Sequence, residues 1–363
     1  MLAKIRDLPV RKGDFISSFV QHIFMRLIFI ITFLILIIFI RGCIESYPKE
    51  PKTEIHNLSE ENKTDINTTP EEREGTIPAT APKQINSKLI MWTKENGIRT
   101  SGVSSSTIIK DNKYWMYYTW DGIELATSSD GLNFANRENV IKNGPIGSEK
   151  EMITNPTVFR LLDGRYRMIY EGSKWAEDET GERYQTNRKL YSAVSTDGKK
   201  WTKEDGVRFW DNGDGKPGEI FTSVPDVIRL DDGRLRMYYT RGATSATALS
   251  SDEGLTWAKE TDIELRKVAI DPDIVRLDGN SYKLFFTTFA DEFGFGEQWI
   301  MSAGSTDGVN FVIDEGKIIE PSTSGGLVTD PDVIKTDNGY RMYYGEFKKG
   351  EYESNIMSAF SSG

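Results

Sequence analysis

The chain has very little cysteine and histidine. Cys43 is its single cysteine, and His22 and His56 are its only histidines in 363 residues. One cysteine cannot form a disulfide within the chain. All three residues lie before residue 57, so the remaining sequence excludes a cysteine nucleophile, a serine–histidine triad and a histidine-bound zinc ion. Any catalysis there has to use carboxylates, hydroxyl groups or amines.

Net positive charge is also lacking. The sequence has 45 Lys and Arg against 55 Asp and Glu, which gives a formal net charge of −10. A chain this acidic is not expected to bind the phosphate backbone of a nucleic acid. No glycine-rich loop leads from a strand into a helix, so a nucleotide site is not indicated. Hydrophobic residues make up 38% of the chain, which suits a globular body.

One long hydrophobic run stands near the N-terminus. Residues 23–40 are nearly all Ile, Leu and Phe, and about 18 apolar residues approach the lower limit for a membrane-spanning helix. Basic residues precede the run and acidic residues follow it, so the positive-inside rule places the N-terminus in the cytoplasm. We therefore expect a cytoplasmic basic segment at 1–22 and a single-pass anchor in the cell membrane at 23–41. The C-terminal domain would be extracytoplasmic.

A second interpretation of this segment stays open. The residues before Cys43 resemble a lipobox, at which a lipoprotein signal is cleaved and the cysteine lipidated, although Arg41 stands where a small residue is expected. Both alternatives hold the domain outside. Residues 42–85 are polar and rich in Glu, Lys, Thr, Asn and Pro, which predicts a disordered linker.

Internal repetition dominates residues 86–363. The clearest copy runs from Val224 to Trp257 and contains two apolar stretches joined by an Asp-Gly turn, a third strand, and a turn that ends in an aromatic residue. Related copies surround Asn155, Asp271 and Asp330, and a more divergent copy comes first in the chain. Five copies, each long enough for four strands, predict an all-β, five-bladed β-propeller.

The two ends of the repeat region are complementary. The last copy stops at residues 361–363, before its aromatic residue and outer strand, and the missing piece stands at the front: Trp92–Arg99 matches Trp201–Arg208. We expect this N-terminal strand to complete the fifth blade. Such closure protects sheet edges that would otherwise pair with other chains.

Two family resemblances follow from these motifs. Ser250–Trp257 resembles the Asp-box turn of sialidase-type propellers, with shorter relatives that begin at Ser128, Ser195 and Ser305; we interpret all four as structural turns without a catalytic role. The blade count and the Asp-Pro-Asp strand starts resemble five-bladed glycoside hydrolases of the arabinanase, xylosidase and invertase-like superfamily, over about residues 90–363. The resemblance implies a glycan ligand and acidic residues in a central funnel. Some relatives only bind sugars.

Carboxylates near the strand starts are the catalytic candidates, because glycoside hydrolysis needs two carboxyl groups across the scissile bond. Glu171 replaces the Thr of other copies and is our hypothetical general acid, since a crowded acidic funnel would raise its pKa. Asp226 or Asp273 would act as base or nucleophile, and Asp332 would orient them. An Asp repeated in three of five copies can equally be structural, and that interpretation stays open.

Six residues are predicted to contact the substrate. One is a polar residue at a strand start, and two are charged residues at positions where the other copies have none. Three are tryptophans in loops, whose rings can stack on sugars. The six residues are Asn155, Arg241, Glu346, Trp120, Trp175 and Trp299. An ordinary ion pair is the alternative for Arg241. No cofactor is predicted, although a structural calcium ion remains an alternative. The leading hypothesis is a membrane-tethered glycoside hydrolase; the alternative is a non-catalytic propeller that binds glycan or protein.

Overall fold

The structure is a computed structural model, and it describes residues 91–179, 181, 183–211, 213, 220–277, 281–290, 296–349 and 353–362. The predicted cytoplasmic segment, anchor and linker lie outside these residues. Within the described ranges, no helix is long and apolar enough to cross a membrane.

The described residues form five four-stranded antiparallel sheets, which confirms the predicted all-β, five-bladed propeller. From the inside outward, blade 1 contains β2 (Val103–Lys110), β3 (Lys113–Trp120), β4 (Gly122–Ser128) and β5 (Ala135–Ile141). Blade 2 contains β6 (Met152–Arg160), β7 (Tyr166–Glu177), β8 (Arg183–Ser195) and β9 (Thr202–Lys203). Blade 3 contains β10 (Thr222–Arg229), β11 (Leu235–Arg241), β12 (Thr244–Ser250) and β13 (Ala258–Ile263).

Blade 4 contains β14 (Ile270–Arg276), β15 (Tyr282–Phe289), β16 (Gln298–Ser305) and β17 (Val312–Ile313). Blade 5 contains β18 (Leu327–Thr336), β19 (Gly339–Phe347), β20 (Asn355–Ser361) and β1 (Thr93–Ser101). The second strands are largely buried because neighbouring blades cover both of their faces; β15, for example, is buried at all eight positions.

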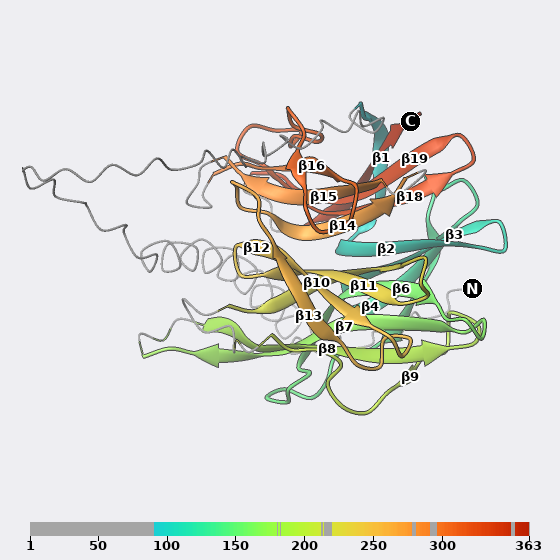
Figure 1. Ribbon diagram of the computed structural model, residues 1–363, viewed down its shortest axis with the longest axis vertical. Coiled ribbons are helices and arrows are strands. Elements are labelled where there is room, and N and C mark those ends of the chain that lie inside the picture. The colour runs from blue at the N-terminus through green and yellow to red at the C-terminus, as the bar shows by residue number, and fades with distance from the viewer. Residues whose placement is uncertain are drawn as a thin grey trace, which may run out of the picture.

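The N-terminal strand closes the ring as the sequence predicts. β1 pairs antiparallel with β20, with Thr93 opposite Phe360, and Figure 1 shows β1 in cyan beside the red strands of blade 5. The ring of Trp92 meets that of Phe285 in blade 4 edge to face, with centroids 5.6 Å apart. Trp201 makes the same kind of contact with Tyr117 at 5.7 Å. Trp92 therefore occupies in blade 5 the place of the aromatic residue in the other turns.

The four Ser-x-Asp turns have the capping bonds expected of them. In the turn after β12, Ser250 Oγ donates to Asp252 Oδ1 at 2.8 Å, and the Thr256 N–H donates to the same oxygen at 2.9 Å. Turns of this kind also bind a tyrosine of the preceding blade. Tyr238 OH of blade 3 donates to the Gly308 carbonyl of blade 4 at 2.7 Å, and Tyr117 OH of blade 1 donates to the Gly198 carbonyl of blade 2 at 2.8 Å. The turns thus stabilise contacts between blades.

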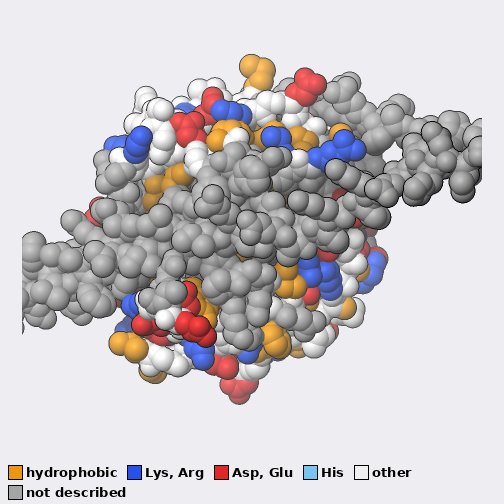
Figure 2. Space-filling model, turned by 90° about the vertical axis from the view of Figure 1, so that its left-hand side faces the viewer, with side chains coloured by type: hydrophobic (Ala, Val, Ile, Leu, Met, Phe, Trp, Pro, Cys, Tyr) orange, Lys and Arg blue, Asp and Glu red, His pale blue; other side chains and the backbone are white. Residues whose placement is uncertain are grey.

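The inner strands β2, β6, β10, β14 and β18 all begin on one face, which we call the mouth face. The connections between second and third strands open on this face too, and the Ser-x-Asp turns lie on the opposite face, which we call the turn face. The hairpin of β7 and β8 is the longest and extends beyond its sheet on the left of Figure 1. Figure 2 looks at the molecule from that side and shows acidic and basic side chains interspersed over the described surface.

Candidate active site

Each inner strand carries a β-bulge at the same place. The register with the second strand slips there in all five blades, and a residue of the bulge has a positive φ. These upper-ring residues are Ser104 (50°), Asn155 (53°), Val224 (42°), Asp271 (52°) and Asp330 (51°). Left-handed backbone is costly for residues other than glycine, and both such strain and bulges are concentrated at functional sites. The bulge recurs in all five blades, so the upper-ring residues are candidates for a functional site.

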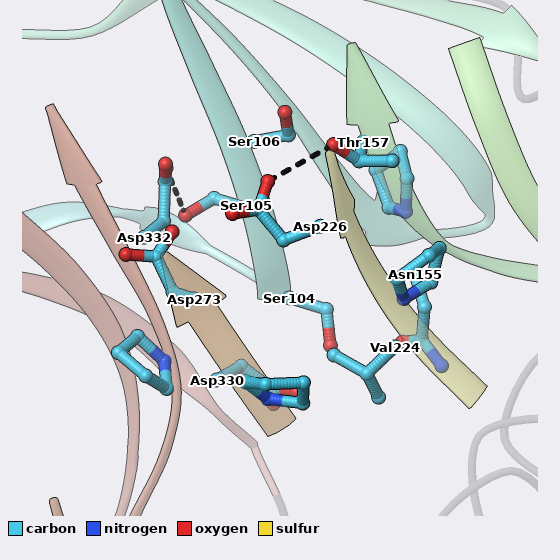
Figure 3. Close-up of a pocket in the computed structure, with 14 residues that line it drawn as sticks. Ser104, Ser105, Ser106, Asn155, Thr157, Val224, Asp226, Asp273, Asp330 and Asp332 are labelled. Atoms are coloured by element: carbon cyan, nitrogen blue, oxygen red, sulfur yellow. Dashed lines mark hydrogen bonds between the residues drawn. The ribbon is translucent and has the colours of Figure 1, made fainter. Parts of the chain in front are cut away.

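A second ring lies two residues further along each inner strand. We call it the lower ring, and it consists of Ser106, Thr157, Asp226, Asp273 and Asp332. Residues of both rings, except Asp271, line an axial cavity of about 30 Å³ (Figure 3). A buried water occupies roughly 10–15 Å³ by this measure, so the cavity admits water but not a sugar ring. A sugar ring does not fit into the space that these residues enclose.

The lower ring binds the backbone of the next blade. In each of four bonds, a side-chain oxygen of the lower ring accepts a backbone N–H of the following blade. Ser106 Oγ accepts the Val158 N–H at 3.0 Å, and Asp226 Oδ2 accepts the Ile274 N–H at 2.9 Å. Asp273 Oδ2 accepts the Val333 N–H and Asp332 Oδ1 the Thr107 N–H, both at 3.2 Å. Thr157 Oγ1 donates to Asp226 Oδ1 at 3.2 Å, which Figure 3 shows as a dashed line. These bonds join adjacent blades around the axis.

The lower-ring carboxyl groups have raised pKa values. Burial raises the pKa of Asp226 to about 6. The pKa of Asp273 lies well above its usual value of 3.8, because of burial and of the charges of Asp226 and Asp332. Burial also raises the pKa of Asp332. Within the described ranges, no group of three or more His, Cys, Asp or Glu side chains is arranged to hold a metal ion.

Threonines of the second strands bind the bulges. The N–H groups of Asn155, Asp271 and Asp330 donate to the hydroxyl oxygens of threonines in the preceding blade. These bonds go to Thr119 (2.9 Å), Thr240 (2.8 Å) and Thr287 (3.3 Å), respectively. Glu171 occupies the same place in blade 2 and makes no such backbone bond there. The departure from the repeat thus replaces a structural hydroxyl by a carboxylate.

The Glu171 carboxylate is fully buried and surrounded by donors. Asn155 Nδ2 donates to its Oε2 at 3.0 Å, and Ser223 Oγ donates to the same oxygen. Arg188 Nε lies 3.8 Å from Oε1. The Arg188 guanidinium stacks on Phe221 at 4.4 Å from the ring centroid, which holds it in this position. These donors and the guanidinium fix the orientation of the carboxylate.

Two further carboxyl groups lie at the upper ring. Thr329 Oγ1 donates to Asp271 Oδ2 at 2.8 Å, and burial raises the pKa of Asp271. The pKa of Asp330 lies well above its usual range because of burial and the charges of Asp271 and Glu171. Glu171 belongs to blade 2, whereas Asp271 and Asp330 belong to blades 4 and 5. The mouth therefore contains carboxyl groups from opposite sides of the ring.

Two other predicted site residues have polar partners of their own. Arg241 pairs with Asp211, with Nε 2.5 Å from Oδ2, and so makes the ion pair that the sequence left as an alternative. Glu346 accepts the Ser322 N–H at 2.6 Å.

The three predicted tryptophans differ in their surroundings. Trp299 packs against two core clusters, and Lys317 covers its ring at 3.9 Å. Trp175 lies on the extended hairpin with Arg183 at 5.2 Å from its ring, and Trp120 is 45% exposed at the mouth end of β3.

Asp271, Asp330 and Arg188 are not among the site residues predicted from the sequence. Asp271 and Asp330 each begin an Asp-Pro-Asp triplet, and only the second Asp of each triplet was chosen. The triplets themselves indicated both residues. Residues two apart in a strand share one face, so both carboxyl groups of a triplet are expected to approach the axis. Arg188 gave no such signal, since it lies in a stretch of mixed polar residues.

No protein-family model matches the sequence, and a search of curated proteins finds no match. Solved structures do share the fold. An α-L-arabinanase of Cellvibrio cellulosa complexed with arabinohexaose aligns with a TM-score of 0.56 and 12% identity, over 72% of this chain and 92% of that one. An exo-1,5-α-L-arabinanase from a bovine ruminal metagenomic library gives 0.55 and 14%, over 72% and 95%. The GH43 protein BlXynB of Bacillus licheniformis gives 0.56 and 13%, over 73% and 54%.

Proposed function

We propose that the chain is a carbohydrate-active propeller that hydrolyses glycosidic bonds at the mouth of its funnel. The observation that carries the proposal is the placement of carboxyl groups on opposite sides of the ring, with Glu171 in blade 2 and Asp330 in blade 5. Hydrolysis of a glycosidic bond needs an acid and a base or nucleophile on its two sides. The arabinanase and GH43 structures of the same fold support a glycan as the substrate class.

We assign the acid role to Asp330 and the base or nucleophile role to Glu171, which reverses the hypothesis from the sequence. A general acid must hold its proton near neutral pH, and burial beside two negative charges raises the pKa of Asp330. Glu171 instead accepts three hydrogen bonds and faces Arg188 at 3.8 Å. Asp271 completes the group, because its charge contributes to the raised pKa of Asp330.

The lower-ring aspartates, in this proposal, hold the blades together and do not react. Asp226, Asp273 and Asp332 each accept a backbone N–H of the next blade. They affect the reaction only through the geometry of the upper ring.

We also propose that residues 23–41 anchor the propeller in the cell membrane with the domain outside. The proposal rests on the hydrophobic run and on the basic residues before it. Treatment of intact cells with a protease, compared with lysed cells, tests it. Degradation of the propeller only after lysis would contradict an extracytoplasmic domain.

The proposed reaction is tested by a hydrolysis screen of the full-length chain on aryl glycosides, arabinan and xylan. Glu171→Gln and Asp330→Asn are measured in parallel, each expected to lower turnover of the polysaccharides by roughly 10²–10⁴-fold. Glu204→Gln is the matched control, because Glu204 also belongs to blade 2 but follows the outer strand β9 and pairs with Arg167 of β7 at 2.7 Å. Equal turnover in all four proteins would refute the assignment.

A non-catalytic glycan-binding propeller is the second candidate. Ser104 and Val224 occupy two of the five upper-ring places and have no carboxyl group. A pure binder needs hydrogen-bonding groups and stacking rings, but no carboxyl pair. Glycan binding without turnover on any substrate would favour this candidate.

A further inference from the structure

On the mouth face, blade 1 differs from blades 3 and 5 in one residue near the end of its second strand. This place follows the threonine position of the second strand and holds Arg241 in blade 3, Glu346 in blade 5 and Trp120 in blade 1. Arg241 and Glu346 are covered by Asp211 and Ser322, which lie in the segments that precede the inner strands of their blades. Trp120 is 45% exposed.

The exposure of Trp120 has a topological cause. In blade 1 the segment before the inner strand is Gly102 alone, because β1 ends at Ser101 and β2 begins at Val103. A single residue cannot provide a covering side chain. Gly102 also packs closely on Tyr118, since a Cβ there would lie 2.6 Å from Tyr118 Cδ2. The ring closure thus leaves an indole ring uncovered on the mouth face.

Polar groups beside Trp120 are held in place. Arg137 Nε and Nη2 donate to Glu124 Oε2 at 3.2 and 3.1 Å, and Tyr118 OH donates to the same oxygen at 3.0 Å. The guanidinium carbon lies 5.6 Å from the centroid of the Tyr118 ring and 5.8 Å from that of the Trp120 ring. This network orients Arg137 before any ligand binds, which lowers the entropic cost of binding.

Asp121 and Asn143 complete the cluster. Asn143 Nδ2 donates to Asp121 Oδ1 at 3.0 Å, and its own Oδ1 accepts the Ile153 N–H at 2.8 Å. Trp120, Asp121, Arg137 and Asn143 are all exposed. An aromatic ring beside a fixed guanidinium and a carboxylate matches a sugar, whose C–H face stacks on the ring while its hydroxyl groups bind the polar atoms.

We propose that Trp120, Asp121, Arg137 and Asn143 form a second saccharide-binding site, outside the funnel, for a neutral sugar residue of a glycan chain. Glu124 and Asp121 offset the charge of Arg137, so an anionic sugar gains nothing from the site. A single indole ring is also much smaller than the roughly 800 Å² that each partner buries in a stable protein interface. That the ligand is a glycan rests on the proposed function; the arrangement of the four side chains does not.

Binding of the full-length chain to branched arabinan and to arabinohexaose, measured by titration calorimetry, tests the site. Trp120→Ala should weaken arabinan binding roughly tenfold, as expected for the loss of one stacked ring. Trp120→Tyr keeps a ring and should retain most of the affinity. Trp210→Ala is the matched control, because Trp210 is 39% exposed and lies in a different part of the chain.

Asp121→Ala gives an independent readout, because Asp121 is exposed and its replacement leaves the Trp120 ring in place. It should weaken arabinan binding as well. Unchanged affinity of Trp120→Ala, or a wild-type chain that binds neither glycan, would overturn the proposal. Failure of the proposed hydrolysis is seen separately, as lack of aryl-glycoside turnover by the wild-type chain, which needs only the funnel.

Discussion

Arg341 of β19 and Glu95 of β1 form a two-armed ion pair, with Nε and Nη2 each 2.9 Å from a carboxylate oxygen. Ser358 Oγ donates to the same carboxylate at 2.6 Å. The pair Arg236–Glu260 has the same geometry within blade 3. In blade 5, however, the two partners are separated by 246 positions in the sequence, so the pair also joins the first strand to the last blade.

We predict that Glu95→Gln destabilises the fold more than Glu260→Gln does. Both variants remove a half-buried partner of an arginine, and the remaining charge should cost about 2 kcal/mol. Only Glu95→Gln also weakens the attachment of β1, whose detachment exposes the edge of β20. Urea unfolding of both variants measures the difference. Equal losses of unfolding free energy would show that β1 is held mainly by its backbone bonds.

Asp273→Asn should make stability less dependent on pH. The pKa of Asp273 in the folded chain lies well above the usual 3.8, so above about pH 4 the folded state binds more protons than the unfolded state. Stability from this group is therefore lost as the pH rises through the raised pKa. Asn resembles the protonated form and can still accept the Val333 N–H. The denaturation midpoint of the variant, relative to wild type, should be higher at pH 8 than at pH 5. Parallel midpoints across this range would contradict the raised pKa.

Asp330→Asn and Glu171→Gln should respond differently to the leaving group. A general acid matters most for a poor leaving group, so Asp330→Asn should lose far more activity on arabinan than on a nitrophenyl glycoside. Glu171→Gln should lose activity on both. Asp330→Asn should also abolish the basic limb of the pH–rate profile. The opposite pattern would return the acid role to Glu171, as the sequence first indicated.

Val224→Asn should stabilise the fold. Val224 has a φ of 42°, which is strained for a β-branched residue, whereas Asn155 has 53° at the matching place in blade 2. Relief of this strain should add about 1 kcal/mol to the unfolding free energy. Thermal unfolding of the variant checks the direction. A lower melting temperature would mean that contacts of the Val224 side chain outweigh the backbone strain.

The blades were predictable because their signals are local. Alternating apolar stretches, Asp-Gly turns and aromatic turn ends recur with each copy, and Trp92 identifies the displaced outer strand. The site was only partly predictable, because a bulge changes the direction of side chains without leaving a pattern in the sequence. The choice between Asp271 and Asp273 depends on that direction. The partners of Arg241 and Glu346 come from segments more than 20 residues away, and no local pattern indicates them.

The entry point of the chain has a consequence for how the propeller is presented. Thr93 lies opposite Phe360, at the end of blade 5 where the hairpin of β18 and β19 turns, so Met91 stands on the turn face. The funnel and the Trp120 site open on the other face. The described part of the chain thus enters the propeller from the side opposite the funnel. A long polymer can then reach the funnel without passing Met91.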